Sequence, residues 1–167
     1  MQRRTLLLGL STVAILAACG KPGSKFITYS GPAVTQIQVF KADRKMYLFS
    51  GNTVIKKYKF GLGGNPIGPK RFEGDSKTPE GLYYIDRQNP NSRYHLSIGI
   101  SYPNPADRAY AESQNKKPGG DIFIHGRAKA NKGKGKDWTA GCIAVKDEEI
   151  EEIYSMVRIG TPIFIFP

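Results

Sequence analysis

The sequence predicts a single, mainly β domain, of the β-sandwich or barrel type, with one amphipathic helix near its C-terminal end. Three observations lead to this fold class. First, short apolar runs recur along the chain, several alternating with polar residues as in half-buried strands. Second, 19 glycines and 11 prolines supply turn formers, many of them between these runs. Third, only one stretch, after position 146, repeats apolar residues with a clear helical period.

Seven or eight strands are expected, and the first three form a meander of hairpins because short polar turns separate them. A glycine- and proline-rich loop at 61–75 follows the meander, and a short helix is expected within 103–114. The expected strands are 35–40, 45–49, 53–60, 81–86, 94–100, 121–125, 142–145 and 161–166.

The amphipathic helix is expected to be capped by Asp147 and to end at Gly160. Acidic residues 148–149 in its first turn and Arg158 in its last turn match the helix dipole. Apolar residues recur at i, i+3, i+4 and i+7 and should face the core: Ile150, Ile153, Tyr154 and Val157.

Residues 1–18 have the features of an export signal, with two arginines followed by an apolar run over 6–17 that is too short to span a membrane comfortably. The run ends "LAAC", which resembles a bacterial lipoprotein signal in which Cys19 becomes the lipidated first residue. An ordinary cleaved signal is the alternative, and the "QRRTLLL" start also fits a twin-arginine address. We therefore expect an exported protein of the cell envelope or periplasm, anchored to a membrane by lipid on Cys19. Residues 19–33 would be a tether and 34–167 the folded domain.

Lipid on Cys19 would leave Cys142 without a partner for an intramolecular disulfide. An unpaired thiol in an exported protein suggests a reactive role, although a buried cysteine that packs as a small hydrophobe is the alternative.

The net charge is +11, and removing the signal leaves 23 basic against 14 acidic residues. Export, and the absence of an RNA-binding motif or recognition helix, argue against nucleic acid as the partner. An anionic cell-wall polymer or membrane surface is the better-placed partner, and a role of the charge in solubility alone is the alternative.

The stretch "DIFIHGRAKANKGKGKDWTAGCIAV" (121–145) places His125 and Cys142 seventeen residues apart, each beside a glycine. Attack of a cysteine on an amide needs a thiolate, a base that can then act as an acid, and donors for the oxyanion. Cys142 and His125 would supply the first two if their strands lie side by side, with the adjoining ends bridged by the loop. The backbone N–H of Cys142, after the flexible Gly141, is the expected oxyanion donor. His125 should matter most as the proton donor to the leaving amine, worth about 10²–10⁴-fold.

These residues resemble the catalytic domain of the L,D-transpeptidase (YkuD) family. His125-Gly126 and the later "TAGC" (139–142) match the family's histidine, spacer and Ser/Thr-x-Gly-Cys, and "GDSKTPEGLYYI" (74–85) matches an upstream segment of the family. The likeness runs from about residue 35 to residue 166. It implies a YkuD-like fold, with Cys142 as nucleophile and His125 as base and acid. It also implies that the Gly126 carbonyl orients the imidazole, that peptidoglycan stem peptides are the substrate, and that no cofactor is needed.

Two positions depart from the family's pattern: Ala140 stands where most members have histidine, and Ala144 where they have Asn or Arg. "DWTAGCIAV" and "NPNSRYHLSIGISYPNPAD" are closer to a branch that includes enzymes cleaving a wall peptide from an attached lipoprotein. Transfer and hydrolysis therefore both stay open, and a wall-linked protein is an alternative partner. A non-catalytic wall-binding lipoprotein is the third hypothesis, against which the intact Cys142 and His125 count.

Four further residues are candidates for substrate binding: Thr139, His95, Arg127 and Trp138. Thr139 would shape the site floor by the same resemblance. His95 would either face the cleft with Ser97 or be a structural strand histidine. Arg127 begins a lysine-rich loop that is either solvated or a lid for wall-peptide carboxylates, and Trp138 is either a substrate platform or, as we favour, a loop anchor. A zinc site of His95, His125 and Cys142 would lack a fourth ligand and the usual spacing, so no metal is expected.

Overall fold

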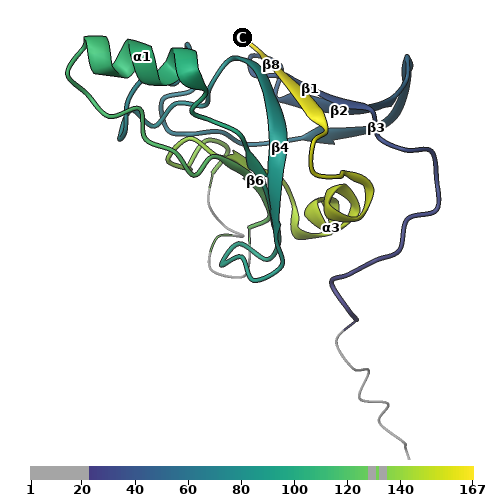
Figure 1. The fold of residues 1–167 in the computed structure, drawn as a ribbon. Coiled ribbons are helices and arrows are strands. Elements are labelled where there is room, and N and C mark those ends of the chain that lie inside the picture. Colours follow the sequence, from purple (N-terminus) through teal and green to yellow (C-terminus); the bar gives the residue numbers. More distant parts are fainter. Residues whose placement is uncertain (1–22, 128–130, 132–134) are drawn as a thin grey trace, which may run out of the picture.

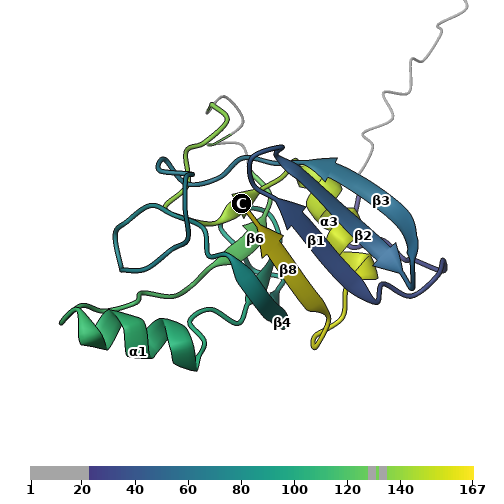
Figure 2. The ribbon, with the colours of Figure 1, turned by 90° about the horizontal axis from the view of Figure 1, so that it is seen from above.

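The computed structural model describes residues 23–127, 131 and 135–167 of the chain (Figures 1 and 2). The predicted signal peptide, the lipidation residue Cys19 and the loop lysines 129, 132 and 134 lie outside the described residues. Among the described residues, no helix is long and apolar enough to span a membrane.

Eight strands form one sheet in the order β3-β2-β1-β8-β4-β5-β6-β7. The β1–β8 and β6–β7 pairs are parallel and the other pairs are antiparallel. The strands are β1 (Gln36–Phe40), β2 (Lys45–Ser50), β3 (Thr53–Lys59), β4 (Gly81–Asn89), β5 (Ser97–Ile100), β6 (Phe123–His125), β7 (Ile143–Ala144) and β8 (Pro162–Phe166).

The two ends of this strand order meet, because Gly61, just after β3, exchanges two backbone hydrogen bonds of 2.8 Å with Ala144 of β7. The sheet therefore curls into a closed, barrel-like form, and this seam lies directly beside the predicted nucleophile. The predicted mainly β fold class, including the meander of the first three strands, is confirmed.

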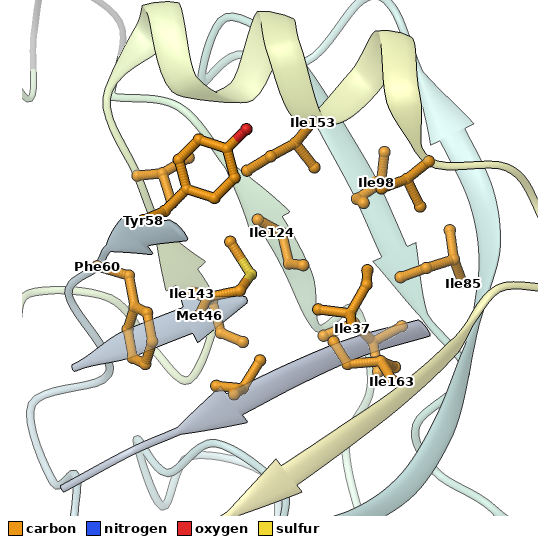
Figure 3. Packing of buried hydrophobic residues seen from close by; sticks show 14 of the residues in the cluster. Ile37, Met46, Tyr58, Phe60, Ile85, Ile98, Ile124, Ile143, Ile153 and Ile163 are labelled. Atoms are coloured by element: carbon orange, nitrogen blue, oxygen red, sulfur yellow. The ribbon is translucent and has the colours of Figure 1, made fainter. Parts of the chain in front are cut away.

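Helix α3 (Asp147–Met156) packs on one face of the curled sheet (Figures 1 and 2). Figure 3 shows Ile153 directed at strand residues such as Ile98 and Ile124, all of which are fully buried. Fully burying one such side chain stabilises the fold by about 1.5–3 kcal/mol. At the helix's polar side, Glu152 accepts hydrogen bonds of 2.9 Å from Lys56 Nζ and from the Tyr58 hydroxyl of β3.

The helix begins differently from the prediction. Lys146 is the N-cap residue, and its backbone N–H donates to the carboxylate of Glu149 at 2.8 Å. Asp147, which was predicted to cap the helix, is its first residue. Its Oδ1 instead accepts the backbone N–H of Arg127 at 2.6 Å, which joins the helix start to the end of β6.

The helix also ends earlier than predicted, at Met156, so that Arg158 and Gly160 lie beyond it. Gln88 of β4 donates to the carbonyls of Tyr154 and Val157, both at 3.0 Å, and so satisfies the helix end from a different strand. Gly160 has a φ of 91° and lies in the turn that leads into β8.

The short predicted helix is present as α1 (Pro105–Ser113), which lies away from α3 (Figure 1). Its N-cap Asn104 and its N3 residue Asp107 form a reciprocal capping box. Asp107 also accepts a 2.9 Å hydrogen bond from the Tyr83 hydroxyl of β4, which attaches the helix to the sheet.

The described part of the predicted tether contacts the domain. Lys25 Nζ donates to the carbonyls of Pro90 and His95, at 2.6 and 3.2 Å, and the ring of Phe26 lies 6.2 Å from that of Tyr154 on α3. The predicted boundary between tether and domain stays a prediction.

Candidate active site

Strands β6 and β7 bring His125 and Cys142 together. They pair in parallel, with Ile124 opposite Ile143 and His125 opposite Ala144. Cys142 directly precedes β7 and is therefore level with Phe123, on the same face as His125 and about two residues along the strand. The predicted neighbourhood of the two strands is confirmed. The prediction that the loop joins adjoining ends is wrong, because a parallel pair requires the loop to return along the strands.

His125 and Cys142 open into one pocket of about 470 Å³. The thiol is half-buried and forms no disulfide with any described residue, so a substrate can reach it from this pocket. The pocket is lined by Asn89, Asn91, Ser92, Arg93, Tyr94, Ser97, Asp121, Phe123, His125 and Cys142.

The imidazole of His125 is only 3% exposed and its orientation is held on two sides. Its Nδ1 lies 2.5 Å from the carbonyl oxygen of Gly126, as the family resemblance implied. Because a carbonyl can only accept, Nδ1 carries the proton and Nε2 of the neutral ring is left as a base. The ring of Tyr94 stacks on the imidazole at 4.4 Å, and Trp138 meets it edge-on at 5.8 Å.

Burial favours the neutral form of both the His125 and the Cys142 side chain. Desolvation lowers the pKa of His125 below its ordinary value, more than the bond to the Gly126 carbonyl raises it. Desolvation likewise raises the pKa of the Cys142 thiol above its ordinary range, and the opposing hydrogen bond from the backbone of Phe123 is weaker. The Cys142 sulfur lies 3.4 Å from the carbonyl of Asp121, which is a partner for a protonated thiol. The resting site is therefore a thiol and a neutral imidazole.

The turn before β7 leaves the backbone N–H of Cys142 available. Gly141 has a φ of 129°, and a Cβ there would collide with the carbonyl of Lys77, so only glycine fits. Its own N–H donates to Thr139 Oγ1 at 3.2 Å. No hydrogen bond from the Cys142 N–H to another described residue is found. This N–H can therefore receive the oxygen of a carbonyl under attack by the sulfur.

Two of the proposed substrate-binding residues, Thr139 and Trp138, contact the residues that line the pocket but do not line it themselves. Thr139 is 8% exposed, and its hydroxyl donates to the carbonyl of Cys142 at 2.7 Å, so it holds the turn. Trp138 packs against the rings of His125 and Tyr94. Neither residue lines the pocket that contains the thiol.

The other two proposed substrate-binding residues, Arg127 and His95, lie outside the pocket that contains the thiol. Arg127 lies with its guanidinium 5.8 Å from the Trp138 ring and lines a separate, larger pocket beside the seam. His95 precedes β5, which begins at Ser97 rather than at the predicted Tyr94, and its Nε2 lies 2.6 Å from Glu151 Oε1 on α3. His95 therefore contacts α3 and does not line the pocket, which agrees with the structural role and not with the substrate-binding role. Among the described residues, no cluster of histidine, cysteine and carboxylate side chains is suited to a metal ion.

Sequence reasoning missed Arg93, although the segment 89–95 was recognised as a feature of the chain. Arg93 is the one cationic side chain among the lining residues, and its guanidinium makes no hydrogen bond or ion pair within the described part of the chain. Nearby Arg87 is engaged, because it pairs with Asp86 and Asp121 and stacks on Phe123. Arg93 is therefore available to an anionic ligand.

Known proteins resemble this chain in sequence and in fold. Residues 35–165 match the family model of the YkuD L,D-transpeptidase catalytic domain. The L,D-transpeptidase-family protein YafK of Escherichia coli K12 is 32% identical over 127 residues, which cover 72% of this chain and 46% of YafK. The chain thus spans about half the length of the curated relatives it matches.

Solved structures show the same fold. The helical cell shape determining protein Pgp2 from Campylobacter jejuni is similar with a TM-score of 0.63 and 26% identity, over 84% of this chain and 50% of that one. Bd1075 from Bdellovibrio bacteriovorus is similar with a TM-score of 0.60 and 26% identity, over 80% and 48% of the two chains. From the family match, the chain belongs to the YkuD family of L,D-transpeptidase catalytic domains.

Proposed function

We propose that this chain is a cysteine-dependent L,D-transpeptidase that acts on peptidoglycan stem peptides. Cys142 is the nucleophile, and the bond attacked joins an L-centre to a D-centre, at diaminopimelate. The observation that carries the proposal is the shared pocket of Cys142 and His125, with Nδ1 of the imidazole engaged by Gly126 so that Nε2 is the available base.

The first half-reaction forms a thioester. As Sγ attacks the carbonyl carbon, its proton passes to His125 Nε2 and the carbonyl oxygen becomes an oxyanion beside the Cys142 N–H. The C–N bond then breaks, and the imidazolium gives its proton to the departing amine. Burial suits this order, because neither charge exists before the substrate arrives.

The second half-reaction resolves the thioester. His125 takes a proton from an incoming amine, the amine nitrogen attacks the acyl carbon, and the thiol leaves with the proton returned to sulfur. The product is a new amide. If water takes the amine's place, the product is a carboxylic acid and the enzyme is a hydrolase.

Arg93 would bind a carboxylate of the stem peptide. Guanidinium groups pair with carboxylates in a two-pronged geometry, and Asn91 lines the same pocket. This residue replaces Arg127, His95 and Trp138 as the leading candidate for substrate recognition.

Hydrolysis is the second candidate function, supported by the likeness of "DWTAGCIAV" to a branch that includes enzymes cleaving a wall peptide, and left open by Ala140 and Ala144. The hydrolytic substrate would be a wall peptide or a peptide joined to a wall-linked protein. Incubating the protein with a disaccharide-tetrapeptide, with and without a D-amino acid as acceptor, separates the two by product mass. Exchange of the terminal residue for the acceptor indicates transfer, and addition of water alone indicates hydrolysis. If no product depends on Cys142, the remaining hypothesis is a non-catalytic wall-binding protein.

We further propose that the protein is exported and carries lipid on Cys19, which would place the domain at a membrane facing the wall. The support is the signal-like composition of residues 1–18 followed by "LAAC". Mass spectrometry of the N-terminus of protein isolated from membranes tests this, because an unmodified or unprocessed N-terminus would contradict it.

A further inference from the structure

Thr78 contacts the turn that carries the nucleophile from a distant part of the chain. Its side chain is fully buried, and its hydroxyl donates to the carbonyl of Gly141 at 2.7 Å, across 63 positions of sequence. This hydroxyl belongs to the segment between the 61–75 loop and β4, and it does not line the pocket of the thiol.

The hydrogen bond sets the direction of the N–H of Cys142. The Gly141 carbonyl and the Cys142 N–H belong to one planar trans peptide, in which C=O and N–H point in opposite directions. When Thr78 binds the oxygen, the N–H must point away from Thr78. A peptide after glycine rotates readily, because glycine tolerates nearly every backbone conformation. The hydroxyl therefore selects one orientation among several that Gly141 permits.

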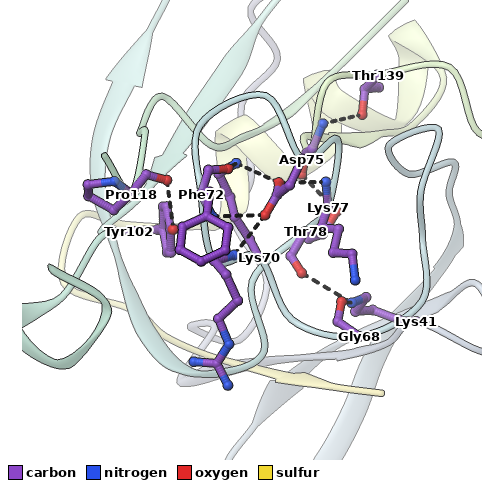
Figure 4. Close-up of polar contacts among 12 residues, drawn as sticks. Lys41, Gly68, Lys70, Phe72, Asp75, Lys77, Thr78, Tyr102, Pro118 and Thr139 are labelled. Atoms are coloured by element: carbon purple, nitrogen blue, oxygen red, sulfur yellow. Dashed lines mark hydrogen bonds and ion pairs between the residues drawn. The ribbon is translucent and has the colours of Figure 1, made fainter. Parts of the chain in front are cut away.

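The backbone of Thr78 is itself fixed. Lys41, which is 2% exposed, donates from Nζ to the carbonyls of Thr78 and Gly68 and to the carboxylate of Glu80, at 3.1, 2.7 and 2.8 Å. The backbone N–H of Lys70 donates to the same Thr78 carbonyl at 3.2 Å. Figure 4 shows Lys41, Gly68 and Thr78 together in this arrangement. Because these bonds fix the backbone of Thr78, its hydroxyl binds the Gly141 carbonyl from a fixed position.

We propose that Thr78 is a positioning residue for the oxyanion site, acting through the Gly141–Cys142 peptide. This inference rests on the proposed function of Cys142. Thr139 has the complementary task on the other side of the nucleophile, because its hydroxyl holds the carbonyl of Cys142 itself. Among the described residues, Thr78 is the one whose side chain holds the Gly141 carbonyl, and through that peptide it orients the N–H that faces the developing negative charge.

The experiment compares two reactions of the same sulfur in Thr78→Val and Thr78→Ser. Turnover of a disaccharide-tetrapeptide passes through an oxyanion, whereas alkylation by iodoacetamide forms the S–C bond as iodide leaves and creates none. Alkylation is measured at pH 9, where the thiol reacts at a convenient rate. Thr161→Val, which alters a buried threonine in the turn before β8, is the matched control. Circular dichroism verifies that each variant is folded.

In Thr78→Val we expect kcat to fall about 10- to 100-fold, within the loss caused by removing one oxyanion donor. KM should change less than threefold, because the oxyanion exists only in the transition state. Alkylation should stay within about twofold of the wild type. Thr78→Ser, which keeps the hydroxyl, should recover most of kcat, and Thr161→Val should match the wild type.

Any other outcome contradicts the positioning role of Thr78 or the proposed function. If turnover in Thr78→Val stays within threefold of the wild type, or falls in parallel with alkylation, the positioning role is wrong. Failure of Thr78→Ser to recover turnover overturns it as well. If the wild type shows no turnover that depends on Cys142, the proposed function fails, and the inference about Thr78 fails with it.

Discussion

Cys142 should respond to pH as a buried neutral thiol and not as the thiolate of a preformed ion pair. The perturbation is pH itself, and the readout is the rate of alkylation of Cys142 by iodoacetamide. An ordinary thiol with a pKa of about 8.5 is about 3% ionised at pH 7. Because burial raises the pKa of Cys142, the ionised fraction at pH 7 should be smaller still. The alkylation rate should rise about tenfold per pH unit, without a plateau up to at least pH 9.

Turnover should follow a different profile, because His125 then removes the thiol proton as the substrate is attacked. His125 must be unprotonated to do so, and burial lowers its pKa below 6.5. The acid limb of kcat/KM should therefore lie below pH 6.5, with turnover rising as pH rises through the lowered pKa and complete by pH 7. At pH 7 the protein should thus be catalytically active while its thiol is almost inert to iodoacetamide.

The assay is single-site alkylation followed by intact mass from pH 5 to pH 10, beside muropeptide turnover over the same range. His125→Gln is the control: it should abolish turnover and leave the alkylation profile nearly unchanged. An alkylation plateau between pH 5 and pH 8 that disappears in His125→Gln would show a thiolate–imidazolium pair, and would refute the view that burial dominates both groups.

Three substitutions test separate parts of the site. Cys142→Ala should abolish turnover while the melting temperature stays within a few degrees of the wild type; residual turnover would remove Cys142 from the mechanism. Arg93→Gln should raise KM for a tetrapeptide substrate about 10- to 100-fold with kcat nearly unchanged, since a charged hydrogen-bonded pair contributes about 1.5–3 kcal/mol. Arg127→Gln, in the other pocket, is its control, and equal effects of the two would contradict the assignment of Arg93. His95→Ala should lower the free energy of unfolding, measured in urea, by about 1 kcal/mol through loss of the contact with Glu151. Its kcat/KM should be unchanged, and a large loss would restore His95 to the site.

The strands, and the two residues that we propose to react, were predictable because both depend on local signals. Alternating apolar residues predicted the sheet, and the spacing of His125-Gly126 from "TAGC" predicted the nucleophile and its base. The ends of α3 were not predictable in this way. Glu149 caps the helix by reaching back to a backbone N–H, and Gln88 satisfies its far end from another strand. Neither contact leaves a recognisable pattern in sequence.

The substrate-facing residues were missed for a related reason. A strand over 94–100 would place Tyr94 on the face opposite His95, and it would not include Arg93. In the structure the strand begins at Ser97, and the preceding residues turn so that Arg93 and Tyr94 line the pocket while His95, with a φ of 77°, lies against α3. Because the strand begins three residues later than predicted, Arg93 lines the pocket and His95 does not.

The position of the thiol at the seam of the sheet explains why so many distant segments converge on it. Strand β7 has only two residues, too few to fix the position of the preceding Cys142 by its own hydrogen bonds. Its backbone is held by β6 on one side and by Gly61 on the other, while the threonine hydroxyls of residues 78 and 139 bind the carbonyls on either side of the Cys142 backbone N–H. The contacts at the seam therefore also hold the turn that carries the Cys142 thiol. A substitution that removes one of these threonine hydroxyls should reduce turnover before it unfolds the domain, because the apolar core that includes Ile143 and Ile153 keeps all its side chains.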